Sequence, residues 1–373
     1  MVRIAPFAVE QWMDEYETTP GVLNVAETCA ASVSIDDLVG MCTDAKTPGP
    51  IDTSIKLTYG AIPGSPLLRE RIAAICSNED TRLAAEDVVV AQGAIGANFL
   101  ALYSIGAEVT LWKLKEEENC VPNTDELADM IQKNTKMIII NNPNNPTGVP
   151  IPNSVLKRIA QIAQEKDIIL FSDEVYRPLF HGGASGEMEV PQPATTLGYE
   201  KSIVTGSMSK GYALAGIRVG WIASKDKSII SAVMAARDYT TISVSQIDDQ
   251  IARYALSPAV LPSLVDRNLT LARTNSRLVK EFIARYKSVC SWVEPTAGTT
   301  AFVRFSKDGK PVNDVDFCLD LLRKHNVLLV AGSKCFGSDE DFKGYVRMGY
   351  VCETEVLVEG LKRLGACIES NLL

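Results

Sequence analysis

Between residues 87 and 223, short runs of apolar, mostly β-branched residues alternate with longer stretches of helical periodicity. The runs that we expect to form strands are 87–91, 109–112, 137–140, 167–171, the residues around 203, and 217–223. Continuous apolar strands separated by helices are typical of a parallel sheet that helices cover on both faces. The pattern therefore predicts an α/β fold built around one mainly parallel sheet.

Polar or small residues follow four of the expected strands directly. These clusters are Gly93-Ala94, 141–148, 173–176 and 207–210. In open α/β sheets, ligands bind beyond the carboxyl ends of the strands. Since the four clusters should meet at that edge, we expect the functional site there.

The chain is long enough for two domains of ordinary size, with 373 residues of which 46% are hydrophobic. After about residue 258 the strand–helix alternation gives way to long helices and a few strands. We expect residues 46–257 to form a large α/β domain, and residues 1–45 together with 258–373 to form a smaller α+β domain.

The net charge of −9 argues against nucleic acid or an anionic membrane as a partner, because both require basic patches. Nine cysteines without a CxxC pair indicate neither a zinc site nor a disulfide framework, so no metal is expected and a cytoplasmic protein fits best. We see no export signal and no apolar run of membrane-spanning length. The expected ligand is a small molecule.

Lys210 is the strongest candidate for chemistry. It follows an apolar strand and lies among small residues, where an amine is desolvated and can lose its proton, as imine formation with an aldehyde cofactor requires. Ser207, Ser209 and Arg218 could then hold a phosphate. The alternative is an ordinary loop lysine at the end of a strand.

Other candidates also have structural alternatives. Asp173 ends an apolar strand and needs a partner, which could be the protonated nitrogen of a pyridine ring or the start of the next helix. Arg347 lies in a short apolar strand and could bind the α-carboxylate of an amino acid or form an internal ion pair. The Gly93-Ala94 turn before a helix is a possible anion site, but such turns often serve only close packing.

Taken together, these motifs resemble the class I and II aminotransferases, which are fold-type-I pyridoxal-phosphate enzymes. The resemblance rests on 145–148, 173–176, 207–210 with 218–220, and Arg347, in order and spacing. It implies a seven-stranded type of sheet in the large domain and pyridoxal 5′-phosphate as cofactor, with Lys210 forming the internal aldimine. The resemblance further implies these contacts: Asp173 on the pyridine nitrogen; Asn145 and Tyr176 on the phenolic oxygen; the Ala94 and Ile95 amides with Ser207, Ser209 and Arg218 on the phosphate; and Arg347, with Asn145, on the substrate.

Two more implications concern neighbouring residues. Tyr59 matches a tyrosine that reaches the phosphate of the neighbouring subunit, which implies a homodimer with shared active sites. Ile95 stands where the family often has a hydroxyl, so one phosphate hydrogen bond is expected to be lost.

A finer resemblance points to the capreomycidine-synthase type of this superfamily, through 4–7, Glu10, Trp12 and 237–241. Residues 23–28 are expected to form an extended N-terminal arm. If Glu27 on this arm faces the pocket, a substrate with a cationic side chain is expected. The leading hypothesis is transamination of an α-amino acid, and the alternative is elimination with cyclisation of a substituted basic amino acid. A cofactor-binding domain without activity is disfavoured because Lys210, Asp173 and Arg218 are all present.

One departure from the family lies between Tyr103 and Ser104. The resemblance implies roughly 25 to 30 further residues here, including a strand and an aromatic ring that stacks on the cofactor. Because their loss would remove apolar contact on one face of the cofactor, we expect that the protein contains a segment here that the printed sequence lacks.

Overall fold

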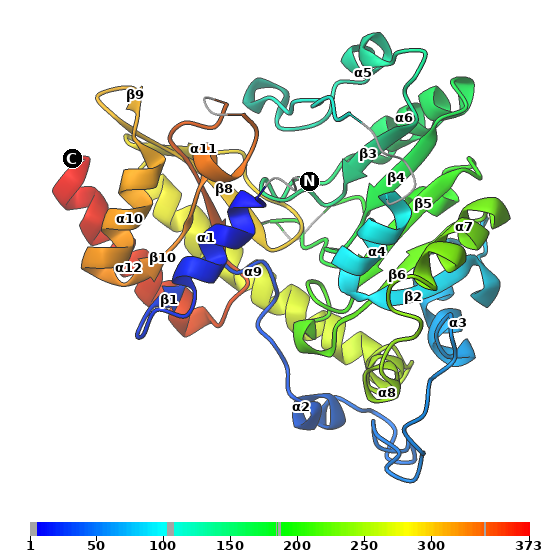
Figure 1. Ribbon diagram of the computed structural model, residues 1–373. Helices are drawn as coiled ribbons and strands as arrows, with labels where there is room; N and C mark the ends of the chain where they lie inside the picture. The colour runs from blue at the N-terminus through cyan, green and yellow to red at the C-terminus, as the bar shows by residue number, and fades with distance from the viewer. Residues whose placement is uncertain (1–5, 103–107, 184, 186–187, 339–340) are drawn as a thin grey trace.

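The computed structural model describes residues 6–102, 108–183, 185, 188–338 and 341–373. Its elements gather in two regions, and Figure 1 shows one region around the strands β2 to β6 and the other around α1, β8, α10 and α12. The helix α9 (Leu261–Arg285) runs from the first region to the second (Figure 1).

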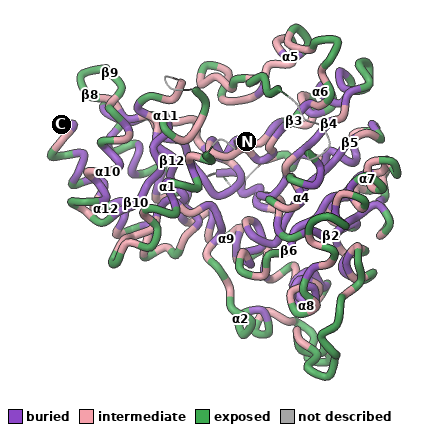
Figure 2. The backbone as a smooth tube through the Cα atoms, in the orientation of Figure 1, coloured by how far each residue is buried: buried purple, intermediate pink, exposed green. Residues whose placement is uncertain are grey.

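The central sheet has the strand order β2-β6-β5-β4-β3. Its strands are β2 (Val88–Gln92), β3 (Met137–Asn141), β4 (Ile169–Asp173), β5 (Ser202–Ser207) and β6 (Val219–Ala223). β3, β4 and β5 are parallel, whereas β6 is antiparallel to both of its neighbours. The strands are mostly buried (Figure 2), as their apolar sequences predict.

Helices cover both faces of this sheet. On one face, α3 (Pro66–Ile75), α6 (Asn153–Glu165) and α8 (Gln246–Ala255) pack with the side chains of Val88 and Val90. On the other face, α4 (Gly93–Leu102) and α7 (Lys227–Arg237) pack with Val89 and Ala91. Successive strand residues thus enter opposite layers of the core.

Local sequence signals set several helix ends. Ser34 caps α2 (Ile35–Gly40) in a capping box, since its hydroxyl accepts from the Asp37 amide and the Asp37 carboxylate accepts from the Ser34 amide. Ser65 caps α3, whose first residue is proline. The remaining short helices are α5 (Thr124–Met130) and the 3-10 turns Ala85–Asp87, Glu116–Glu118, Ala194–Thr196 and Ala215–Ile217.

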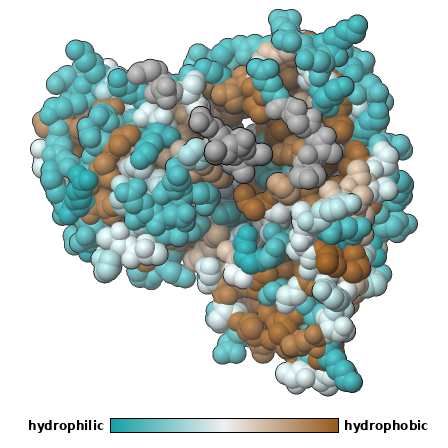
Figure 3. All heavy atoms as spheres, in the orientation of Figure 1, coloured by the Kyte–Doolittle hydropathy of each residue, from teal (hydrophilic) through white to brown (hydrophobic). Residues whose placement is uncertain are grey.

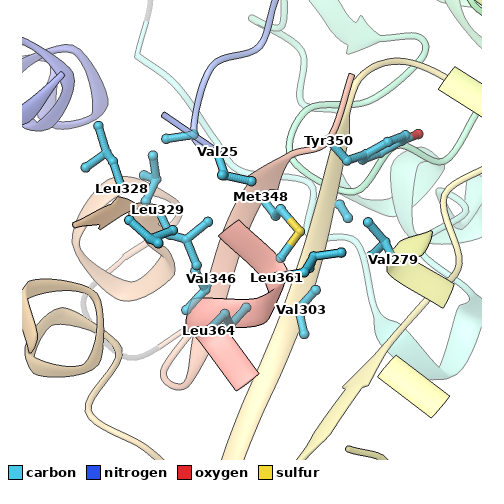
Figure 4. Close-up of a cluster of buried hydrophobic side chains, with 14 of the residues drawn as sticks. Val25, Val279, Val303, Leu328, Leu329, Val346, Met348, Tyr350, Leu361 and Leu364 are labelled. Carbon is cyan, nitrogen blue, oxygen red and sulfur yellow. The ribbon is translucent and has the colours of Figure 1, made fainter. Parts of the chain in front are cut away.

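The second region contains a sheet of the order β11-β12-β8-β7, with β9 paired to β8, and a parallel pair β1–β10. The strands are β1 (Leu23–Asn24), β7 (Cys290–Trp292), β8 (Thr300–Lys307), β9 (Lys310–Pro311), β10 (Val327–Leu328), β11 (Val330–Ala331) and β12 (Tyr345–Gly349). The helices are α1 (Ala8–Tyr16), α10 (Asp314–His325), α11 (Gly332–Cys335) and α12 (Thr354–Asn371). Figure 4 shows how Val25 of the N-terminal arm packs into the same apolar cluster as Met348 of β12 and Leu361 of α12.

The central sheet has five strands in the described residues, fewer than the seven that the resemblance implies. The strand expected at 109–112 is not formed. A strand needs a neighbouring ladder of hydrogen bonds, and this segment pairs with none in the described part of the chain. Two of its apolar side chains, Val109 and Leu111, are 75% and 53% exposed. The Tyr103–Ser104 junction lies outside the described residues.

The division into domains 46–257 and 1–45 with 258–373 stays a prediction. No helix among the described residues is long and apolar enough to cross a membrane.

Candidate active site

The strand register places the predicted polar clusters along one edge of the central sheet. Asn141 pairs with Asp173 across β3 and β4, and Ser207 pairs with Gly220 across β5 and β6. Gln92, the last residue of β2, pairs with Val219, the first residue of β6. The end of each parallel strand and the start of β6 therefore meet where the sequence places its candidate site.

Lys210 lies just beyond the end of β5, and its amine contacts the N-terminal arm. The Nζ atom donates to Thr28 Oγ1 at 2.5 Å, and it lies 3.5 Å from Cys29 Sγ and 3.8 Å from Glu27 Oε1. Burial lowers the pKa of Lys210, but Tyr176, Cys29 and Glu27 together outweigh burial, so the pKa is raised. The sequence predicts an amine that easily loses its proton. The folded chain instead favours the protonated amine, because the arm places the acidic Glu27 beside Lys210.

The arm is held rigidly against β12. A Cβ on Gly349 would lie only 1.7 Å from the carbonyl oxygen of Glu27, so β12 requires glycine where the arm crosses it. The Gly349 amide donates to Val25 O at 2.8 Å, and Thr299 Oγ1 donates to Thr28 O at 2.7 Å. These bonds fix the segment that contacts Lys210, although the arm is distant from it in sequence.

Asp173 is half-buried, and desolvation raises its pKa. Its Oδ2 accepts from Asn98 Nδ2 at 2.9 Å, and its Oδ1 accepts from the Val175 amide at 3.2 Å. Among the described residues, no cation forms an ion pair with this carboxylate. The bond to Val175 closes a turn rather than capping a helix, so the helix-cap alternative is not what the structure contains.

Asn145 and Tyr176 line the same region. The backbone amide of Asn145 donates to Asn141 Oδ1 at 2.7 Å. The side-chain oxygen of Asn145, Oδ1, is buried without a hydrogen-bond partner among the described residues. Tyr176 is buried, and burial raises its pKa. An unpartnered buried amide oxygen is costly, which makes Asn145 a candidate for contact with a ligand.

The start of α4 and the residues after β5 form a small cradle for an anion. A Cβ on Gly220 would lie 2.7 Å from the Ala94 amide nitrogen, and a Cβ on Gly93 would lie 2.6 Å from Arg218 Nη2. Arg218 Nη1 is 3.4 Å from Ser209 Oγ. Close backbone packing therefore places a guanidinium and a helix N-terminus at one point, which is the geometry that binds phosphate.

Two other predicted residues lie near this cradle with different exposure. Ser207 is buried, and its Oγ accepts from the Ser209 amide at 3.1 Å. Ile95, in the first turn of α4, is 65% exposed and presents no side-chain hydroxyl.

Arg347 is buried in β12 near the arm. Its Nη2 donates to Ala26 O at 3.0 Å, its guanidinium lies 5.7 Å from the Phe336 ring centre, and its Nε has no hydrogen-bond partner among the described residues. No ion pair links it to a described carboxylate, so the internal ion-pair alternative finds no support. A buried guanidinium with an unused donor is suited to binding a carboxylate.

Tyr59 is not brought to the cluster within this chain. Its side chain is 74% exposed and lines a surface groove with Leu57, Gly60 and residues 243–246. Its predicted role requires a neighbouring subunit.

Two contact residues, Thr28 and Asn98, were missed by sequence reasoning. Asn98 follows Ala94 by one helical turn, so its side chain points to the same side of α4 as the cradle. This spacing was a usable signal. Thr28 is brought to Lys210 only by the tertiary path of the arm, and no local pattern marks it.

The residues present fit pyridoxal 5′-phosphate. The polar groups match its three polar parts: a cradle for the phosphate, the Asp173 carboxylate, which has no ion-paired cation among the described residues, for the ring nitrogen, and the Asn145 side-chain NH2 with the Tyr176 hydroxyl as donors to the phenolic oxygen. This is a class of site built for a phosphorylated aldehyde cofactor beside a reactive lysine.

Comparison with known proteins agrees with that class. Residues 101–364 match the family described as aminotransferase class I and II. The chain belongs to this family, whose cofactor is pyridoxal 5′-phosphate.

Individual relatives are similar over much of the chain. It is 29% identical to capreomycidine synthase of Streptomyces vinaceus, over 74% of this chain and 67% of that protein. It is also 29% identical to aspartate aminotransferase of Pyrococcus horikoshii, over 69% of this chain and 63% of the relative. The matched region thus spans about two thirds of the length of these relatives.

Solved structures extend the likeness to the whole chain. A PLP-dependent aminotransferase from Streptococcus suis superposes with a TM-score of 0.87 and 31% identity, covering 99% of both chains. The PLP-dependent cyclase OrfR, at 22% identity and a TM-score of 0.82, shares the fold.

Proposed function

We propose that the protein is a pyridoxal-phosphate-dependent aminotransferase that acts on an α-amino acid. The observation behind this proposal is the position of Lys210, whose amine lies at the sheet edge between the N-terminal arm and the residues suited to the cofactor. When bound, the cofactor supplies an electron sink for the carbanion at the substrate Cα.

Each predicted residue would have one role in holding the cofactor. The Ala94 and Ile95 amides, Ser207, Ser209 and Arg218 would bind phosphate. Asp173 would hold the ring nitrogen in its protonated form, and its burial makes a cationic partner favourable. Asn145 and Tyr176 would contact the phenolic oxygen.

Lys210 would anchor the cofactor covalently and move a proton. Once the substrate amine has displaced it, the Lys210 amine is free to accept the proton from the substrate Cα and return it during the reaction. Glu27 and Tyr176 raise the pKa of Lys210, so they favour its proton-holding form. Arg347, with Asn145, would bind the substrate α-carboxylate and orient the Cα–H bond.

A homodimer with shared sites is part of the proposal. Large exposed apolar side chains near α4 and the Tyr59 groove support it, among them Leu57, Tyr59, Ile95 and Tyr239. Figure 3 shows apolar side chains gathered over the part of this face that contains the central sheet, while the part with α10 and α12 is mostly hydrophilic. The cytoplasm is the proposed compartment, and all nine cysteines are free thiols.

Elimination with cyclisation is the second candidate function. It is favoured by the likeness to capreomycidine synthase and by the position of Glu27, which lies beside Lys210 where a basic substrate would meet it. Both functions use the same lysine and cofactor residues, and they differ in what happens after proton removal.

One experiment separates them. The holoenzyme is incubated with a panel of basic and neutral α-amino acids, with and without a 2-oxo acid, and products are identified by mass spectrometry. Product formation that depends on the 2-oxo acid supports transamination. Cyclic product without a 2-oxo acid supports cyclisation, and no product in either condition contradicts both.

A further inference from the structure

We propose that Glu27 binds a cationic group at the far end of the substrate side chain, so that the site selects basic α-amino acids. This inference rests on the proposed function in one respect: it assumes that an amino acid binds between Lys210 and Arg347. It extends the basic substrate of the second candidate function to transamination and assigns Glu27 as the residue that binds the substrate side chain.

The Glu27 carboxylate is fixed in place. Its Oε1 accepts from the Thr28 amide at 2.6 Å and from the Cys29 amide at 3.0 Å, and it lies 3.8 Å from Lys210 Nζ. Burial raises the pKa of Glu27, but Lys210 and the two amides outweigh it, so the pKa is lowered and the carboxylate is ionised. A preorganised anion of this kind loses little entropy when it binds a cation.

The same carboxylate remains accessible. All the hydrogen bonds just described use Oε1, and no described donor is hydrogen-bonded to Oε2. The Glu27 side chain is 42% exposed. One oxygen therefore anchors the side chain, and the other is open to a ligand.

Glu27 and Arg347 are both associated with the same short piece of the arm. Arg347 Nη2 donates to the carbonyl of Ala26, which directly precedes Glu27. The site thus offers a guanidinium for one end of a substrate and a carboxylate for the other. An amino acid with a basic side chain satisfies both charges.

A dicarboxylic substrate fits this arrangement poorly. Its second carboxylate would share the pocket with the ionised Glu27, and like charges at such range repel. The aspartate aminotransferases among the relatives act on an acidic amino acid by name, and Glu27 argues that this chain does not share that preference.

The test compares L-arginine with L-citrulline, which has nearly the same shape but a neutral ureido group. Binding to the holoenzyme is followed by the change in cofactor absorbance during titration, and kcat/KM is measured separately with a 2-oxo acid. The variants are Glu27→Gln, which keeps an oxygen acceptor for the two amides, and the control Glu17→Gln. Glu17 is an exposed acid whose charge acts on Glu27 from a distance.

We expect the wild type to prefer arginine by about tenfold or more, since a hydrogen bond between charged groups is strong. Glu27→Gln should lose this preference while its affinity for citrulline stays within about twofold. Glu17→Gln should keep the preference.

Equal wild-type affinity for the two ligands would overturn the proposal. So would an equal loss for both in Glu27→Gln, because Glu27 would then be only the counter-ion of Lys210. Preferential arginine binding without amine transfer would leave the Glu27 assignment standing and contradict transamination alone. If neither ligand changes the cofactor absorbance, the Glu27 proposal fails, while the proposed function is tested by the wider panel of amino acids.

Discussion

The Asn98 side chain donates a 2.9 Å hydrogen bond to Oδ2 of Asp173 and so links the helix α4 to the end of β4. The other carboxylate oxygen accepts from the Val175 amide. Two donors on opposite oxygens fix the plane of the carboxylate, and both lower its pKa against the effect of burial. Asn98 is therefore placed to set both the direction and the charge of Asp173.

For Asn98→Ala we expect the pKa of Asp173 to rise further, because one hydrogen bond to the charged form is lost. Cofactor affinity should fall by about tenfold. The loss should be larger at lower pH, where Asp173 is protonated more often. Equilibrium titration with pyridoxal 5′-phosphate over a pH series measures this. Leu102→Ala, at the partly exposed end of the same helix, is the control, and equal losses in both variants would contradict the assignment.

Gly220→Ala should damage the phosphate cradle by overpacking. The added methyl would lie 2.3 Å from the Gly93 carbonyl carbon, so β6 and the start of α4 would have to separate. We expect a loss of about 1 to 3 kcal/mol in the free energy of unfolding and weaker cofactor binding. Gly216→Ala is the matched control, because a Cβ there meets no atom within 4 Å. Chemical denaturation and cofactor titration test both, and an unchanged Gly220→Ala would refute the close contact.

Lys210→Ala should abolish covalent attachment of the cofactor while non-covalent binding persists through the phosphate and ring contacts. Borohydride treatment followed by mass spectrometry distinguishes the two forms, since only a lysine-linked cofactor becomes fixed to the wild-type chain. Cofactor that is fixed to the variant after the same treatment would move the reactive amine to another lysine.

Arg347→Lys should raise the apparent dissociation constant for an α-amino acid by about tenfold, because an ammonium cannot reproduce a two-pronged bond to a carboxylate. Because the substitution keeps the positive charge, the loss of affinity measures the contribution of the two-pronged hydrogen bond. Titration of the holoenzyme with the α-amino acid and with its carboxamide provides the comparison. An equal loss for both ligands would place the carboxylate site elsewhere.

The central layers of the fold follow from local sequence. The apolar runs of β4 and β5 and the helical periodicity of α6 predict a buried sheet covered by helices. Small or polar residues at the strand ends indicate the edge of the sheet at which the site lies. The sequence does not reveal contacts that depend on long-range packing. Thr28 reaches Lys210 because Gly349 lets β12 approach the arm closely, and this proximity links residues far apart in the chain.

The pKa of Lys210 is a second property that local sequence does not predict. Its apolar flanks predict an amine that loses its proton easily, but the pKa depends on the arm residues Glu27 and Cys29 and on Tyr176. Electrostatic balance of this kind depends on distances that only the folded chain defines. The expected strand at 109–112 fails for a related reason, because strand formation depends on a neighbour as well as on the segment itself.

His181 lies outside the proposed chemistry, yet it should make the stability of the protein depend on pH. The ring is fully buried, its Nδ1 accepts from the Gly183 amide at 3.0 Å, and its Nε2 is 2.6 Å from the Tyr350 hydroxyl. Because Nδ1 is an acceptor, the ring is neutral and Nε2 donates to the hydroxyl oxygen. Burial lowers the pKa of His181 from its ordinary 6.5 to about 4.

Acid lowers the stability because the unfolded chain binds a proton at His181 at a higher pH than the folded chain does. Below pH 6.5 the unfolded chain protonates at this residue while the folded chain stays neutral until about pH 4, so acid favours unfolding over that range. Between pH 7 and pH 5 this one group should remove about 2 kcal/mol of unfolding free energy. Urea denaturation at the two pH values, for the wild type and for His181→Gln, measures the contribution as the difference between their pH dependences. His325→Gln removes the other histidine of the chain and serves as the matched control. If His181→Gln and the wild type lose the same free energy between the two pH values, the buried ring is not held neutral in the folded protein.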